Sequence, residues 1–136
     1  SNQQDVVRNE RRQSTENRPY GLTYEVILAA MFPALAVAAV LAADRFKKTF
    51  AVNVLRKIAR LCDCETEAGP VVAPDIGFIC APDMITADAA SLEVLARETG
   101  KADLFAELHK HSPWEHVRAA SRMAGRDTIV TLREIG

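Results

Sequence analysis

The longest hydrophobic segment of the chain runs from residue 26 to residue 43 without a charged residue. Eight of its 18 residues are Ala, and Pro33 lies near its middle. Ala favours helix, whereas an internal Pro removes a backbone hydrogen bond and clashes with the preceding turn. We therefore expect one or two core helices, broken near Phe32 and Pro33 and buried on most faces. A membrane span is the less favoured alternative, because Ala is weakly lipid-seeking and positive charges flank both ends.

Three shorter apolar segments have the composition of β-strands. Residues 49–55 are rich in β-branched and aromatic side chains, and residues 76–81 form a short apolar run between two Pro-Asp turn signals. Residues 128–132 alternate enough to predict a half-buried strand at the end of the chain.

The remaining apolar residues of the second half recur at helical spacing. Thr86 is a candidate N-cap for a helix that ends at Gly100. Residues 103–111 predict a short helix with its apolar side chains on one side. Ser112-Pro113-Trp114-Glu115 has the pattern of a capping box before a helix that ends at Gly125. These elements predict an α/β or α+β fold, with a small sheet of about three strands packed with four or five helices.

Composition and charge limit the domain organisation and the classes of partner. The chain has 136 residues, of which 49% are hydrophobic and 26% charged, and a net charge of -1. We expect a polar tail or linker over residues 1–19 and a single domain over residues 20–136. The chain begins at Ser1 rather than Met, which leads us to expect a fragment of a larger protein. A nucleic-acid partner is not expected, because such surfaces carry a basic excess.

The three cysteines suggest a metal site rather than a disulfide framework. Cys62 and Cys64 flank Asp63, and residues two apart in an extended chain point to the same side. Two thiolates on one side suit zinc or iron, although a tetrahedral site needs two more ligands from Cys80, a His, Asp75 or a second copy. The alternatives are two ordinary cysteines in a turn or a strained disulfide. The odd number of cysteines favours the cytoplasm.

Cys80 lies in the predicted buried strand, and we expect it to be a core residue because free Cys is commonly buried.

Three aspartates bracket the second predicted strand. Asp75 comes directly before it, Asp83 comes two residues after it, and Asp88 follows in the next helix. Carboxylates near strand ends line sites in many α/β folds, where they bind cations or transfer protons. The alternative is ordinary turn and cap chemistry. The three histidines, His109, His111 and His116, are better explained by helix ends than by metal ligation.

Three segments carry a resemblance to a known family. They are Cys62-Asp63-Cys64, Pro74-Asp75-Ile76-Gly77-Phe78-Ile79 and Asp83-Met84-Ile85-Thr86-Ala87-Asp88-Ala89-Ala90-Ser91-Leu92. In order and spacing, this series resembles the C-terminal part of the domain-of-unknown-function 362 family, over roughly residues 50–135. Some members of that family carry ferredoxin-type iron–sulfur modules. The resemblance implies a metal-linked or iron–sulfur-linked role, and it implies that the family's N-terminal half is absent from this chain.

The resemblance assigns motif positions to the candidate site residues. The residues at these positions are Cys62, Asp63, Cys64, Asp75, Asp83 and Asp88. Cys80 stands where the family has a small residue, and Met84 stands where it has Pro.

Our leading hypothesis is a metal site at Cys62 and Cys64, holding zinc or an iron–sulfur cluster. Asp63 and Asp75 would support the ligands or contribute an oxygen, and Asp83 and Asp88 would shape a neighbouring pocket. The upstream half of the same protein or a redox partner would complete the site. The second hypothesis is a non-catalytic structural or interaction domain that forms a homodimer through its Ala-rich helix. The sequence does not indicate whether the protein is an enzyme.

Overall fold

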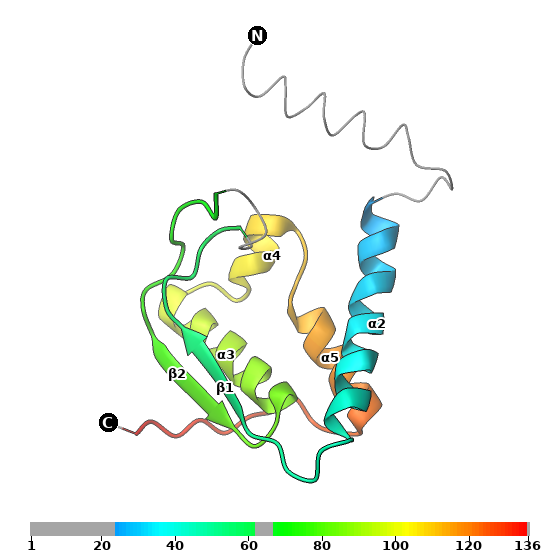
Figure 1. Cartoon of the computed structure of the whole chain (residues 1–136). Coiled ribbons are helices and arrows are strands. Elements are labelled where there is room, and N and C mark those ends of the chain that lie inside the picture. The colour runs from blue at the N-terminus through cyan, green and yellow to red at the C-terminus, as the bar shows by residue number, and fades with distance from the viewer. Residues whose placement is uncertain (1–23, 62–66, 136) are drawn as a thin grey trace.

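The computed structural model describes residues 24–61 and 67–135, with side chains described from residue 30 onward, and shows an α+β fold (Figure 1). Within these residues there are four helices and a two-stranded antiparallel sheet. The elements are α2 (Tyr24–Ala43), β1 (Ala51–Leu55), β2 (Gly77–Ala81), α3 (Met84–Thr99), α4 (Leu104–His109) and α5 (Trp114–Ala124). The fold class predicted from the sequence is confirmed, with two strands in the described residues instead of about three.

The two strands form the base of a long hairpin. β1 and β2 pair in the register that places Ala51 opposite Ala81 and Leu55 opposite Gly77. Beyond them, the Leu61 N–H donates to the Ala68 carbonyl at 2.8 Å. Six residues therefore connect two backbone positions that are hydrogen-bonded to each other.

The predicted closing strand at residues 128–132 is not a strand in the structure. The segment leaves α5 in an extended form, without a ladder partner in the described part of the chain (Figure 1). Ile129 is 83% exposed there. An alternating pattern shows that a segment can suit a sheet, but pairing also needs a neighbouring strand edge, which the local sequence does not reveal.

Helix α3 begins earlier than predicted. Asp83, with φ −153°, is its N-cap, and its side chain accepts a hydrogen bond from the Thr86 N–H. Thr86 is therefore the partner of the cap and not the cap itself, because the Asp83 carboxylate takes both the amide and the hydroxyl of Thr86. The helix ends at Gly100, as predicted, with the left-handed φ of 66°.

The start of α4 and the end of α5 follow the local signals. Asp103 caps α4, where its carboxylate accepts from the Ala106 N–H at 2.8 Å, and Gly125 ends α5 as predicted. The capping box predicted over residues 112–115 is not formed, because the N-cap of α5 is Pro113, without a side-chain cap bond, and the Ser112 hydroxyl accepts from the Trp114 N–H instead.

Helix α3 lies between the sheet and the other helices and joins two groups of buried side chains (Figure 1). One group lies between α2, α3 and α5 and consists of Ala36, Val40, Ile85, Ala89, Val117 and Ala120. The other joins α3 to α4 and to the hairpin and consists of Ala73, Leu95 and Leu104. Ala87 and Ala89 on α3 are completely buried.

Helix α2 differs from its prediction in two respects. It continues through Pro33 instead of breaking there, and Pro33 is exposed. Of its residues from Ala30 onward, only Ala36 and Val40 are buried, so burial on most faces was a wrong expectation. Among residues with described side chains, no helix has the length and apolar character needed to cross a membrane.

Candidate functional site

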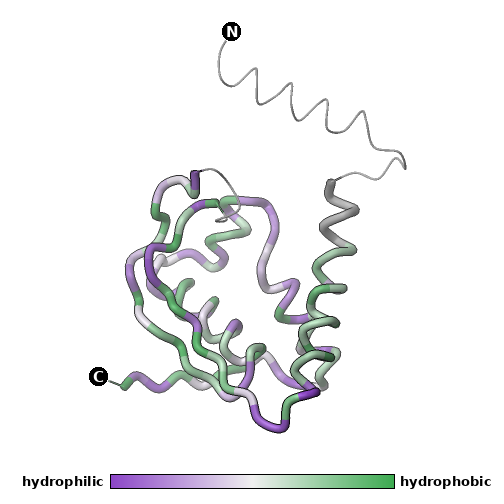
Figure 2. The backbone as a smooth tube through the Cα atoms, in the orientation of Figure 1, coloured by the Kyte–Doolittle hydropathy of each residue, from purple (hydrophilic) through white to green (hydrophobic). Residues whose placement is uncertain are grey.

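The solvent-facing side of α2 is an uncharged apolar surface. We define the α2 outer face as Met31, Ala34, Val37, Ala38, Leu41 and Ala42, all of which are exposed. Their spacing of three and four residues places them on one side of the helix. The side chain of Leu41 is 55% exposed and that of Met31 is 42% exposed. Figure 2 shows this helix as a hydrophobic segment at the edge of the fold.

The opposite side of α2 attaches the helix to the domain. Ala36 and Val40 are buried against Val117 and Ala120 of α5. Phe32 contacts the imidazole of His116 on α5, with ring centroids 4.0 Å apart. Since α5 is the main neighbour of α2, one helix holds it in place and its outer face lacks a partner within the described chain.

The predicted metal ligands Cys62 and Cys64, together with Asp63, lie outside the described residues. Cys80 is exposed, so its expected burial was wrong. It pairs with Val52, near the end of β2 that is far from the hairpin connection. The sheet is covered by α3 on one side only, and β2 alternates, so its second and fourth positions face outward.

Asp75 stabilises the base of the hairpin. Its carboxylate accepts the Lys57 N–H at 2.7 Å and the Arg56 Nε at 3.2 Å. The Lys57 N–H, supported by the Arg56 guanidinium, outweighs desolvation and holds the pKa of Asp75 below its ordinary value. Lys57 has a φ of 47°, so a strained backbone position is fixed beside this carboxylate.

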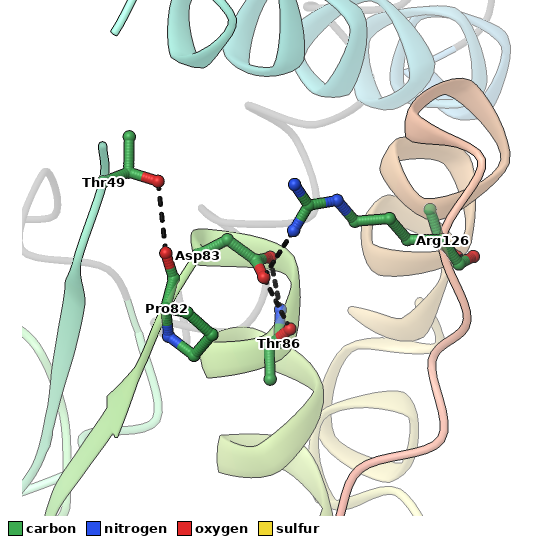
Figure 3. A network of polar contacts seen from close by, with 6 residues as sticks. Thr49, Pro82, Asp83, Thr86 and Arg126 are labelled. Carbon is green, nitrogen blue, oxygen red and sulfur yellow. Dashed lines mark hydrogen bonds and ion pairs between the residues drawn. The ribbon is translucent and has the colours of Figure 1, made fainter. Parts of the chain in front are cut away.

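Asp83 lies at the other end of β2 and connects three segments (Figure 3). Besides capping α3, its carboxylate pairs with Arg126 Nη1 at 2.6 Å, and its side chain is 13% exposed. Burial raises the pKa of Asp83, but the hydrogen bonds from Thr86 and the charge of Arg126 prevail and lower it overall. The neighbouring Pro82 carbonyl accepts from the Thr49 hydroxyl at 3.2 Å. This geometry matches the turn and cap chemistry that the sequence left open.

Asp88 accepts a hydrogen bond from a polar side chain of strand β1. Asn53 on β1 donates through Nδ2 to Asp88 Oδ1 at 2.8 Å and to the Ser91 hydroxyl at 3.0 Å. Ser91 is buried and donates in turn to the Ala87 carbonyl. Sequence reasoning missed Asn53 and Ser91. The signal was available, because Asn53 is a polar residue at the centre of an otherwise apolar strand.

The structure does not bring the three aspartates together. Asp75 and Asp83 lie at opposite ends of the five-residue strand β2, which corresponds to roughly 17 Å of extended chain. In residues 24–61 and 67–135, no group of three or more His, Cys, Asp or Glu side chains could hold a metal ion. His109 stacks on Phe105, and His111 and His116 contact Phe32, which agrees with a packing role.

A cavity of about 420 Å³ lies between α2, α3 and α5. Its wall is mostly apolar, with Asp88, Ser91 and His116 as its polar members. The α2 outer face and this cavity share no residue, but they adjoin at Leu35, which lines the cavity, is 54% exposed and lies one helical turn from Met31 and Ala38.

Comparison of the chain with protein-family models, with curated proteins and with solved structures finds no match. The resemblance to the domain-of-unknown-function 362 family stays a prediction.

Proposed function

We propose that this domain is a non-catalytic association module that forms a homodimer through the α2 outer face. The observation that carries the proposal is the exposure of Met31, Val37 and Leu41 on one uncharged side of a helix whose other side is packed. Contiguous exposed apolar surface of this kind is typical of protein–protein contacts. The alternative of a core helix is excluded for this side of α2, because its side chains face solvent.

A second copy of the chain is a suitable partner because the α2 outer face is complementary to itself. Ala34, Ala38 and Ala42 are spaced by four residues and leave little side chain between two helix backbones. In a two-fold antiparallel crossing centred on Ala38, Ala34 of one copy faces Ala42 of the other. The larger Met31, Val37 and Leu41 then pack beside this line, and the absence of charge means that like copies do not repel.

The expected dimer is weak. Fully burying a Leu, Met or Val side chain contributes about 1.5–3 kcal/mol, and here each is already partly covered. About 1 kcal/mol for each of six such side chains, three from each copy, is about 6 kcal/mol, which exceeds only the lower end of the cost of association of about 4–15 kcal/mol. The oligomeric state should therefore depend on protein concentration.

Light scattering coupled to size exclusion, run over a range of loading concentrations, tests this proposal. We expect the mass to rise toward twice the 14.9 kDa of one chain as the concentration increases. Leu41→Glu should keep the protein monomeric at every concentration, because a charge would be buried in the dimer. Val54→Glu is the matched control, since Val54 is 57% exposed on the outer side of the sheet. Dimers that persist in Leu41→Glu and disappear in Val54→Glu would assign association to the sheet and overturn the proposal.

A second candidate function is a metal site at Cys62 and Cys64, holding zinc or an iron–sulfur cluster. It is supported by the spacing of the two cysteines, since thiolates are the ligands that zinc and iron–sulfur clusters take. The two remaining ligands of a tetrahedral site would come from Cys80, a His, Asp75 or a second copy of the chain. Metal analysis after oxygen-free purification of a Cys62→Ser, Cys64→Ser double variant tests it, with Cys80→Ser as the control. We expect metal to be lost from the double variant alone, and equal metal in all three proteins would reject the site.

A further inference from the structure

The cavity between α2, α3 and α5 has the size and the lining of a small-molecule site. Its volume of about 420 Å³ falls within the range of ligand pockets. Leu35 and Ala39 of α2 and Leu92 of α3 form part of its apolar wall. At about 30 Å³ for each water-sized group, such a volume holds roughly a dozen non-hydrogen atoms.

The polar groups of the wall differ in whether their hydrogen-bonding capacity is used. The Ser91 hydroxyl accepts a hydrogen bond from Asn53 and donates one to the Ala87 carbonyl, so it is already used as an acceptor and as a donor. Asp88 accepts from Asn53 through Oδ1 only, and its Oδ2 has no hydrogen-bond partner among the residues that the structure describes. Asp88 also forms no ion pair within those residues. Asn53 therefore fixes the orientation of a carboxylate that keeps one acceptor oxygen available.

The position of Asp88 determines where a ligand's charge would lie. Asp88 is exposed, whereas Ser91 one turn further along α3 is buried. The carboxylate therefore lies at the mouth of the cavity, next to water, and the apolar wall lies behind it. A ligand with a cationic group and a hydrocarbon part could place the cationic group at the mouth, where it keeps most of its hydration. Its hydrocarbon part would then be removed from water against the apolar wall.

We propose that this cavity binds a small amphiphilic amine, with its ammonium group on Asp88 Oδ2 and its hydrocarbon part against Leu35, Ala39 and Leu92. Charge complementarity selects the cation, since an anion would meet an unneutralised carboxylate. The cavity volume limits the hydrocarbon part to a short chain or a single ring system. The cavity wall shares no residue with the α2 outer face, but Leu35 is 54% exposed and lies one helical turn from Met31 and Ala38, so a dimer contact on α2 can reach the edge of the cavity.

Calorimetric titration with octylamine and with octanol, which have the same chain and differ in charge, tests the proposal. The Leu41→Glu protein is used beside the wild type, so that a dimer contact on α2 cannot compete with the ligand. We expect octylamine to bind about fivefold more tightly than octanol, as for a partly exposed charge pair. Asp88→Asn should remove this preference and leave octanol binding unchanged. Glu93→Gln is the matched control, because Glu93 is an exposed acid on the same helix outside the cavity wall.

The location of the ligand is tested by filling the cavity. Ala39→Phe should abolish binding of both probes, and amide chemical shifts in the unfilled protein should change at Leu92 and Val117 on octylamine addition. Equal affinity for the two probes, or a preference that survives Asp88→Asn, overturns the proposal. Shift changes confined to Met31 and Ala38 on the outside of α2 would indicate nonspecific adsorption to that helix and would also overturn it. Octylamine binding in a monomeric wild type would leave this inference standing while the dimer proposal fails.

Discussion

At the scale of single residues, the candidate aspartates have three different roles. Asp75 holds the Lys57 amide at the hairpin base, Asp83 caps α3, and Asp88 faces a cavity. The sequence places all three near one strand, and proximity along the chain suggested one site. The structure shows why this inference is weak: two of the carboxylates are separated by the full length of β2, and each has local partners.

We expect Asp83 to contribute most to stability of the three, because its carboxylate both caps α3 and pairs with Arg126. Asp83→Ala removes the N-cap and leaves the Thr86 amide without its acceptor, so we expect a loss of about 1–2 kcal/mol in the free energy of unfolding. Arg126→Gln removes only the ion pair, whose Arg side chain is 54% exposed, and should cost less than about 1 kcal/mol. Urea denaturation of both variants measures the difference. Equal losses would mean that the ion pair, and not the cap, stabilises this end of α3.

The lowered pKa of Asp83 predicts a pH dependence of stability. Because its folded pKa lies below the ordinary value of 3.8, its contribution is complete above that value and is lost as pH falls through the folded pKa. Asp83→Asn keeps a capping side chain but cannot ionise. We therefore expect the difference in unfolding free energy between wild type and Asp83→Asn to be constant from pH 7 to about 5 and to shrink below about 4. A difference that grew on acidification would mean that the Asp83 pKa is raised.

At the scale of elements, the C-terminal ends of α3 and α5 were predictable, whereas their N-caps and the burial of the elements were not. Gly100 and Gly125 ended their helices as expected, because the left-handed backbone at a helix C-terminus is a local requirement. Cys80 and most faces of α2 were predicted to be buried, but Cys80 is exposed and α2 buries only the side that carries Ala36 and Val40, because burial depends on what covers an element. Hydrophobicity alone does not distinguish a core face from an association face.

Gly100 allows the C-terminal cap of α3 to be tested. Its φ is 66°, and a Cβ added there would meet no atom within 4 Å, so any penalty comes from the backbone alone. We expect Gly100→Ala to lower the free energy of unfolding by about 1 kcal/mol and Gly100→Asn by less, because Asn tolerates this conformation better. Thermal unfolding of the two variants provides the measurement. An Ala variant as stable as the wild type would contradict the left-handed cap.

At the scale of the whole molecule, α3 is the element around which the domain is built. It contributes Ile85 and Ala89 to one group of buried residues and Leu95 to the other, so both groups separate if α3 unfolds. Helix α2 contributes Ala36 and Val40 to one group only. This asymmetry predicts a hierarchy of local stability, since elements with fewer buried contacts open at lower free energy.

Amide hydrogen exchange at two protein concentrations tests this hierarchy and the role of α2 together. At low concentration, we expect the slowest exchange in α3 between Ala89 and Leu95 and faster exchange in α2. Raising the concentration should slow exchange in α2 by mass action, because a dimer that covers its outer face must dissociate before the helix opens. Exchange in α3 should change less, and the Leu41→Glu protein should show no concentration dependence. If α2 exchanges as slowly as α3 at every concentration and in Leu41→Glu as well, the helix is held by contacts within one chain, and its outer face is not needed for a partner.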